Sequence, residues 1–174
     1  NLFPGEENFL FIVNREHYET TNIAAALKKL KPRATVVQIE KHKLGPVHTV
    51  LEAYDVIGDD EPLVVNYCDF NMHWDYERFK KIMQESDVAG SVICYKDFHP
   101  HLLGSNLYDG VLTADDGITF KEIRPKYSFT PNKMDTWQST GTYYFRTGAM
   151  AKTYCREVID QGIHYDGEYY MSQP

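Results

Sequence analysis

Short apolar runs alternate with helical patterns through the first half of the chain. Residues 9–13, 34–39 and 62–65 are mainly apolar and rich in residues that favour strands. Continuous runs of this length are typical of strands buried on both faces. Between them, apolar residues recur every three or four positions over 23–30, 47–57 and 76–83, which predicts helices with one buried face. Alternation of this kind favours right-handed crossovers and parallel strands.

The second half follows another pattern. Residues 107–113 and 118–123 flank Asp115-Asp116-Gly117, a sequence that predicts a β-hairpin. We also expect strands at 88–95 and 142–145 and a helix at 149–159. The chain is therefore expected to be one α/β domain over residues 1–174, with a mixed, mostly parallel sheet. Ligands of such sheets bind at the carboxyl ends of the parallel strands.

Composition narrows the function classes. The 174 residues carry a net charge of −7, so the basic surface that drives nucleic-acid binding is absent and no nucleic-acid partner is expected. No apolar run approaches the roughly 20 residues that cross a bilayer, and no signal peptide is visible, so no membrane association is expected. Three widely spaced cysteines suggest reduced thiols and a cytoplasmic location.

One acidic residue stands where a strand would deliver it to the ligand-binding edge. Asp69 follows the apolar segment 63–68, and a carboxylate at a strand's carboxyl end can hold Mg²⁺ against substrate phosphates. An aspartate here can equally cap a loop, so the pattern leaves both roles open. Asp75 is expected to cap the helix that follows it.

Two loops carry weaker signals. Gly45 precedes a predicted helix, where backbone amides attract anions or carbonyl groups, and His48 and Thr49 fall in that helix's first turn. A plain turn would give the same pattern. Lys126 ends the predicted hairpin, where it could reach a phosphate or simply face solvent, and Arg124 could pair with a carboxylate.

Other polar residues are less informative about function on their own. Asp166 and Glu168 could form a second acidic site or be two acids in a polar tail. His99 and His101 flank Pro100, and we expect a loop that is exposed or lines the substrate site, in preference to a zinc site. No nucleophile-elbow, zincin, Walker or complete dinucleotide-binding motif occurs.

Taken in order, five parts of the chain resemble the sugar-phosphate nucleotidyltransferase family, and together they cover nearly all of it. The parts are residues 9–14 with His17 (the family's second strand), 44–51 (its base-contacting loop), 63–70 (the strand ending in its metal-binding Asp), 123–126 with 139–145 (its Glu-Lys-Pro region and next strand) and 167–172 (the pocket end in the capsule and lipopolysaccharide branch). Each motif is weak alone, but five in the right order are more specific.

The resemblance implies a Rossmann-like, GT-A-like three-layer fold. It also implies transfer of a nucleotidyl group from a nucleoside triphosphate to a phosphorylated sugar or small alcohol, with release of pyrophosphate, for surface polysaccharide precursors. By position, Asp69 would hold Mg²⁺ at the α-phosphate, and Gly45, His48 and Thr49 would lie by the base. By the same resemblance, Lys126 would be a catalytic residue that binds the phosphate of the second substrate. Glu168 would hydrogen-bond that substrate's hydroxyl groups.

The chain also departs from the family pattern. It begins at the family's second strand, lacks the glycine-rich triphosphate loop, ends before the second metal-binding Asp, and has Pro125 where a Glu is expected. We therefore expect a fold that is incomplete at both ends and that shows little turnover by itself. A missing central strand would expose a sheet edge, which favours homo-oligomer formation.

Two other interpretations stay open. A nucleotide-sugar glycosyltransferase of the related fold would also place an acid after a hydrophobic strand, usually as Asp-x-Asp, whereas Asp69 is followed by Phe70 and Asn71. A non-catalytic nucleotide- or sugar-binding domain would keep the fold without the triphosphate loop. Use of a nucleoside triphosphate as substrate would distinguish the nucleotidyltransferase interpretation from the glycosyltransferase interpretation.

Overall fold

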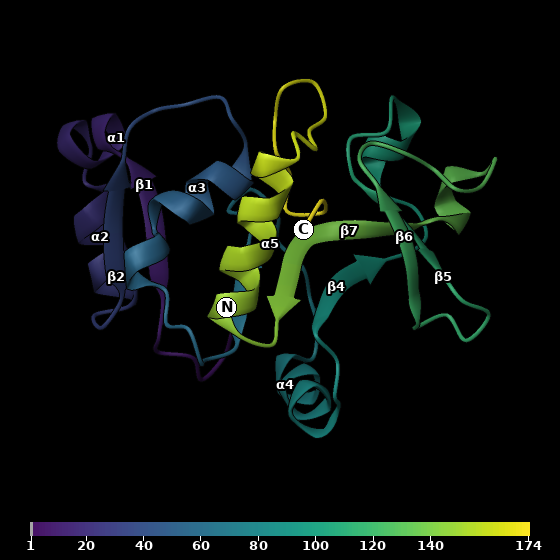
Figure 1. Cartoon of the computed structure of the whole chain (residues 1–174), viewed down its shortest axis with the longest axis horizontal. Helices are drawn as coiled ribbons and strands as arrows, with labels where there is room; N and C mark the ends of the chain where they lie inside the picture. Colours follow the sequence, from purple (N-terminus) through teal and green to yellow (C-terminus); the bar gives the residue numbers. More distant parts are fainter. Residues whose placement is uncertain (1) are drawn as a thin grey trace.

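The computed structural model describes residues 2–174 and alternates strands with helices (Figure 1). The strands are β1 (Leu10–Asn14), β2 (Thr35–Ile39), β3 (Leu63–Asn66), β4 (Gly90–Tyr95), β5 (Gly110–Thr113), β6 (Phe120–Arg124) and β7 (Trp137–Phe145). The α-helices are α1 (Arg15–Thr20), α2 (Ile23–Leu30), α3 (Pro46–Glu52), α4 (Tyr76–Glu85) and α5 (Gly148–Asp160). Short 3₁₀ turns occur at η1 (Tyr54–Val56), η2 (Pro100–Leu103) and η3 (Lys133–Asp135).

The strands form two sheets within the described residues. β1 and β2 pair in parallel, with Ile12 opposite Val37. In the larger sheet β7 pairs with β3, β4 and β5, and β6 continues from β5. Every pairing in this sheet is antiparallel: β7 runs against β3, β4 and β5, and β6 runs against β5. β3, β4 and β5 consequently share one direction.

Helices cover both faces of the larger sheet, giving three layers. Successive residues of a strand point to opposite faces. Tyr143 and Phe145 of β7 join the core formed with α3 and α5, whereas the ring of Tyr144 packs against Phe79 of α4 at 5.8 Å. Residues of β1, β2 and β3 also pack against the core, so α3 and α5 connect the two sheets.

The α/β class and the layer order agree with the sequence prediction, while the pairing differs from it in part. The predicted mostly parallel sheet contains one parallel pairing, β1 with β2, and the rest are antiparallel. The predicted hairpin is present as β5–β6. β7 begins five residues before the predicted 142–145 segment, because its first half is polar yet buried. The short helix α1, capped by the Asn14 side chain, was not predicted.

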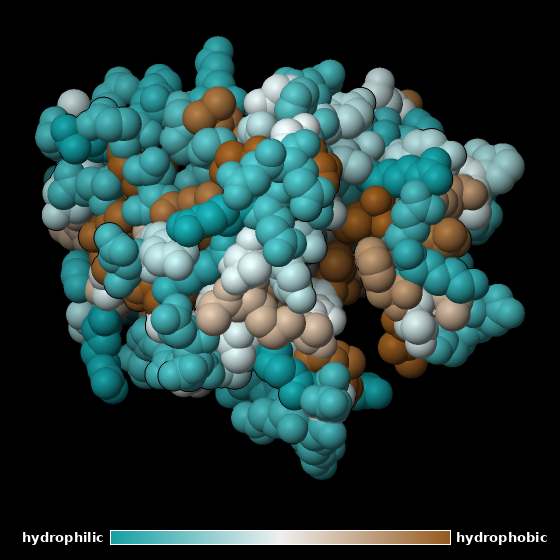
Figure 2. Space-filling model, in the orientation of Figure 1, coloured by the Kyte–Doolittle hydropathy of each residue, from teal (hydrophilic) through white to brown (hydrophobic). Residues whose placement is uncertain are grey.

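The surface on the side seen in Figure 2 is mainly polar, with apolar atoms showing between α3 and α5 and near the β5–β6 hairpin. No helix within residues 2–174 is long and apolar enough to cross a membrane. Cys68, Cys94 and Cys155 are all free thiols, which agrees with the expectation that they do not form a disulfide framework.

A single glycine fixes how close α5 lies to the loop after η1. A Cβ atom added to Gly148 would lie 2.0 Å from the Gly58 carbonyl oxygen, and the Gly148 amide already donates to the Glu61 carbonyl at 2.9 Å. We expect Gly148→Ala to lower the free energy of unfolding by about 1–3 kcal/mol through overpacking. This exceeds the roughly 0.5–1 kcal/mol that alanine gains over glycine in a helix.

Urea unfolding followed by circular dichroism measures the change. Gly104→Ala is the matched control, because its added Cβ would lie 3.9 Å from the nearest atom, and a change of less than about 0.5 kcal/mol is expected there. Equal stability of Gly148→Ala and the parent chain would show that the loop yields without cost.

Candidate functional site

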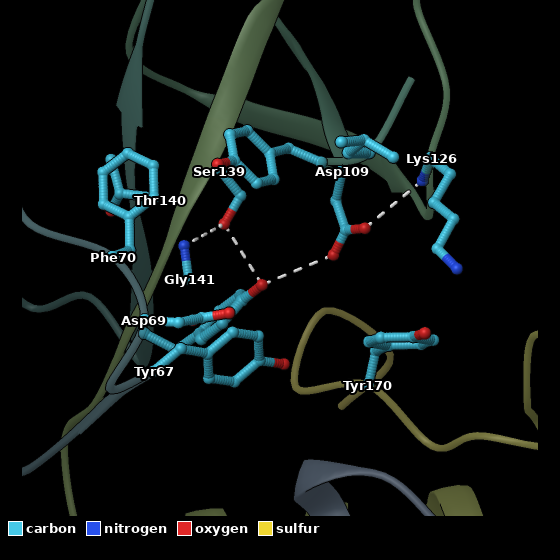
Figure 3. Close-up of a pocket in the computed structure, with 12 residues that line it drawn as sticks. Tyr67, Asp69, Phe70, Asp109, Lys126, Ser139, Thr140, Gly141 and Tyr170 are labelled. Carbon is cyan, nitrogen blue, oxygen red and sulfur yellow. Dashed lines mark hydrogen bonds between the residues drawn. The ribbon is translucent and has the colours of Figure 1, made fainter. Parts of the chain in front are cut away.

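A pocket opens beside the middle of β7 (Figure 3). It encloses about 190 Å³ and draws its lining from five separate parts of the chain. The lining residues are Tyr67, Asp69, Phe70, Leu107, Tyr108, Asp109, Lys126, Ser139, Thr140, Gly141, Tyr143 and Tyr170. Carboxylates, hydroxyl groups and an ammonium therefore face one space, where they can bind a polar, phosphorylated ligand.

Asp69 lies on one side of the pocket, just beyond the end of β3. Its side chain is exposed, and within residues 2–174 no hydrogen bond or ion pair engages its carboxylate. No group of three or more His, Cys, Asp or Glu side chains in the described chain is placed to hold a metal. A lone carboxylate fits Mg²⁺, which is commonly bound through one or two carboxylates together with substrate phosphates and water.

Lys126 enters the pocket from the other side, after β6. Its backbone has φ = 50°, a left-handed conformation that is unusual outside glycine, and its N–H donates to Asp109 Oδ1 at 3.3 Å. The ammonium lies over the rings of Tyr165 and Tyr170. A hydrogen bond with Tyr170 raises the pKa of Lys126, so a full positive charge is available for a phosphate at neutral pH.

A chain of hydroxyl groups lines the pocket between these two side chains (Figure 3). The Ser139 hydroxyl accepts from the Gly141 N–H and donates to the Tyr143 oxygen, both at 3.1 Å. Tyr143 donates in turn to Asp109 Oδ2 at 3.4 Å. Burial and, to a smaller extent, the nearby Tyr67 and Asp109 raise the pKa of Tyr143. Its phenol therefore stays protonated and can donate the hydrogen bond to Asp109.

The predicted nucleotide-binding loop lies outside this pocket. Gly45 has φ = 90°, and a Cβ there would lie 2.6 Å from both the backbone nitrogen and the oxygen of Tyr169. The Tyr169 N–H donates to the Leu44 carbonyl at 2.9 Å, and the Val47 N–H donates to the Tyr169 carbonyl at 3.0 Å. Close approach of the C-terminal segment therefore requires glycine at position 45, whether or not a base binds there.

The two residues that follow are held by neighbouring side chains. The His48 ring meets Tyr169 edge-on at 5.3 Å, and Thr49 Oγ1 lies 3.4 Å from His42 Nε2. Glu168 does not line the pocket either, but it accepts a hydrogen bond from the Tyr170 hydroxyl, which does. The structure thus places Asp69 and Lys126 in the lining of one pocket. Gly45 and His48 lie against Tyr169, beside Glu168, and Thr49 bonds back to Gly45. Their roles stay predictions.

Three other sequence expectations can be compared with the structure. Asp75 caps α4 by accepting from the Arg78 N–H at 2.9 Å, as predicted. Arg124 pairs with Glu122 and lies over the rings of Tyr127 and Phe129, away from the pocket lining.

The histidine loop at η2 packs beside the pocket. His99 Nδ1 and His101 Nδ1 lie 2.8 Å apart, and the His99 ring stacks on Phe70, which lines the pocket. The pair therefore lies in a loop beside the pocket, next to one of its lining residues.

Sequence reasoning missed Asp109 as a pocket residue, and it gave no role to Tyr170, although Tyr170 lies in the segment 167–172 that resembles the family's pocket end. Asp109 directly precedes Gly110 at the start of β5, and an Asp-Gly pair there resembles an ordinary turn. Its burial, at 8% exposure, is the unusual property, and the sequence carries no signal of it.

Neither a family model nor a curated protein matches this chain. Solved structures do resemble it in fold. It superposes on a nucleoside-diphosphate-sugar pyrophosphorylase from Vibrio cholerae RC9 with a TM-score of 0.69 and 18% identity, over 98% of this chain and 67% of that one. A UTP-bound UGPase from Acinetobacter baumannii gives a TM-score of 0.57 with 16% identity, covering 91% of this chain and 67% of that one.

A UDP-glucose pyrophosphorylase complexed with UDP-glucose gives a TM-score of 0.56 with 16% identity, over 80% of this chain and 58% of that one. The chain thus spans between 58 and 67% of the length of these three proteins. These superpositions establish a shared fold, which is the nucleotidyltransferase-like fold expected from the sequence.

His48, in the predicted nucleotide-binding loop, gives the stability of the chain a pH dependence. Burial, followed by the neighbouring His42, lowers the pKa of His48 in the folded chain. The unfolded chain then binds more protons below its own pKa of about 6.5, so we expect the unfolding free energy to fall as the pH drops through that value. NMR titration of the His48 ring should give a midpoint below 6.5, and His48→Gln should reduce the loss of stability between pH 7.5 and 5.5. A ring midpoint above 6.5 would contradict this.

Proposed function

We propose that this protein takes part in nucleotidyl transfer from a nucleoside triphosphate to a phosphorylated sugar or small alcohol, with release of pyrophosphate. The observation that carries the proposal is one pocket in which the free Asp69 carboxylate and the charged Lys126 ammonium face the same space. The fold shared with a nucleoside-diphosphate-sugar pyrophosphorylase and a UTP-bound UGPase supports it. The finer role in surface polysaccharide precursors rests on the resemblance of residues 167–172 to the capsule and lipopolysaccharide branch.

In this reaction an oxygen of the acceptor's phosphate forms a bond to the α-phosphorus of the triphosphate. The bond between that phosphorus and the oxygen bridging to the β-phosphate breaks, and pyrophosphate leaves. The enzyme's part is mainly positioning and neutralisation of negative charge. Mg²⁺ supplies such neutralisation when it is bound.

Each of the residues predicted from the sequence then has a role in this proposal. Asp69 would hold Mg²⁺, because its oxygens have no protein partner among the described residues. Lys126 would bind the acceptor's phosphate, since its ammonium stays charged and Tyr170 orients it. Gly45, His48 and Thr49 would lie near the base. Glu168, which accepts a hydrogen bond from the Tyr170 hydroxyl, would hydrogen-bond the acceptor's hydroxyl groups.

Pyrophosphate release tests the proposal. The complete product of the gene is incubated with each common nucleoside triphosphate, Mg²⁺ and a panel of sugar 1-phosphates and glycerol 3-phosphate. We expect release that depends on both substrates, and Asp69→Asn should lower the rate by about 10²-fold or more, as the loss of a charge-stabilising group usually does. Hydrolysis or transfer from a nucleotide sugar without triphosphate would instead favour a glycosyltransferase.

Asp115→Asn is the matched control, because Asp115 is an exposed carboxylate in the β5–β6 turn with no protein partner among residues 2–174. Its rate should equal that of the parent. If Asp69→Asn also left the Mg²⁺-dependent rate unchanged, the assignment of Asp69 would be wrong. Absence of release with every substrate pair would favour a non-catalytic binding domain.

A further inference from the structure

Asp109 is a buried carboxylate with little inside the protein to compensate its charge. Its residue is 8% exposed, and no Lys or Arg side chain of the described chain forms an ion pair with it. Its two side-chain hydrogen bonds, from the Lys126 N–H at 3.3 Å and the Tyr143 hydroxyl at 3.4 Å, are both long. Burying a carboxylate this way is costly.

The same carboxylate has room to accept more hydrogen bonds, and it faces the pocket. An ionised carboxyl offers about four lone-pair sites, of which the protein uses two. Figure 3 shows Asp109 between the hydroxyl chain from Ser139 and the Lys126 backbone. The Lys126 backbone has a left-handed conformation where its N–H donates to Asp109. The Asp109 carboxylate and the Lys126 ammonium therefore enter the pocket from adjacent positions.

We propose that Asp109 determines specificity for a polyhydroxylated acceptor, its carboxylate accepting hydrogen bonds from hydroxyl groups of a sugar phosphate whose phosphate is bound by Lys126. Two vicinal hydroxyl donors would use the vacant lone pairs and compensate the buried charge. This rests on the proposed function and deepens it by naming a sugar, in preference to a simple alcohol, as the second substrate. It assigns recognition of the substrate's hydroxyl groups to Asp109, a residue not singled out from the sequence, in addition to Glu168.

The amide variant separates charge from position. Asparagine can keep the hydrogen bond from the Lys126 N–H through its carbonyl, so Lys126 stays in place. Its NH₂ can donate to the Tyr143 oxygen, which reverses the direction of the hydrogen bond that Asp109 accepts from Tyr143. The unfolding free energy of Asp109→Asn should equal or exceed that of the parent, since a buried charge is removed. Asp115→Asn serves again as the control for loss of one carboxylate.

Isothermal titration calorimetry on the chain gives the test, with α-D-glucose 1-phosphate, α-D-mannose 1-phosphate, α-D-galactose 1-phosphate, glycerol 3-phosphate and inorganic phosphate as probes. We expect a sugar phosphate to bind the parent most tightly and Asp109→Asn to weaken it about 10- to 100-fold, the usual effect of losing a charged hydrogen bond. Binding of inorganic phosphate should stay unchanged.

The other outcomes decide against the inference in distinguishable ways. Equal loss of sugar phosphate and inorganic phosphate in Asp109→Asn would mean that Asp109 acts only by positioning Lys126. Unchanged sugar-phosphate binding would overturn the inference and leave the proposed function intact. A parent chain that binds no phosphorylated probe would count against the proposed function itself, and the inference would fall with it.

A second measurement needs no variant and so does not depend on its folding. Monodeoxy analogues of the tightest-binding sugar phosphate are titrated into the parent chain. At least one should bind about tenfold more weakly, because the carboxylate then lacks that hydroxyl donor. Equal affinity for every monodeoxy analogue would overturn the inference.

Discussion

The structure depends most on the pairing of β7 with three other strands. β4 pairs with β7 from Gln138 to Phe145, β3 pairs with its second half and β5 with its beginning. Every residue of β7 after Trp137 is buried. Its polar stretch 138–142 is interrupted by Gly141, whose φ of 69° and close approach to the Tyr67 ring leave no space for a side chain. The pocket lies at this irregularity, because the backbone there turns Ser139, Thr140 and Gly141 toward one space.

The C-terminal segment connects the two regions in which function was expected. Through its backbone Tyr169 joins the turn at Gly45, and through its side chain the next residue, Tyr170, joins Lys126. Met171 is buried in the core and donates its N–H to the Tyr67 hydroxyl at 3.1 Å. The loop assigned to the nucleotide and the pocket assigned to the acceptor thus rest on consecutive residues of a single segment.

Local pattern was enough to predict most elements. Apolar runs located β1 and β3, and Asp75 indicated the start of α4. Asp69, expected after a hydrophobic strand, lines the pocket, and its role stays a prediction. The hydropathy pattern failed where polar residues are buried. Gln138, Ser139 and Thr140 are buried polar residues, so the start of β7 was not predicted. The burial of Asp109 was not predicted for the same reason. Strand order was out of reach because pairing with β7 joins residues far apart in the sequence.

The hydrogen bond between Met171 and Tyr67 spans 104 residues of chain. Contacts so distant in sequence are entropically expensive to close, and folds dominated by them form slowly. The pocket walls come from segments beginning at Tyr67 and ending at Tyr170, so no early, locally folded intermediate can contain the site. Ligand binding can therefore report completion of folding, because the pocket is complete only when the segment that carries Tyr170 has docked.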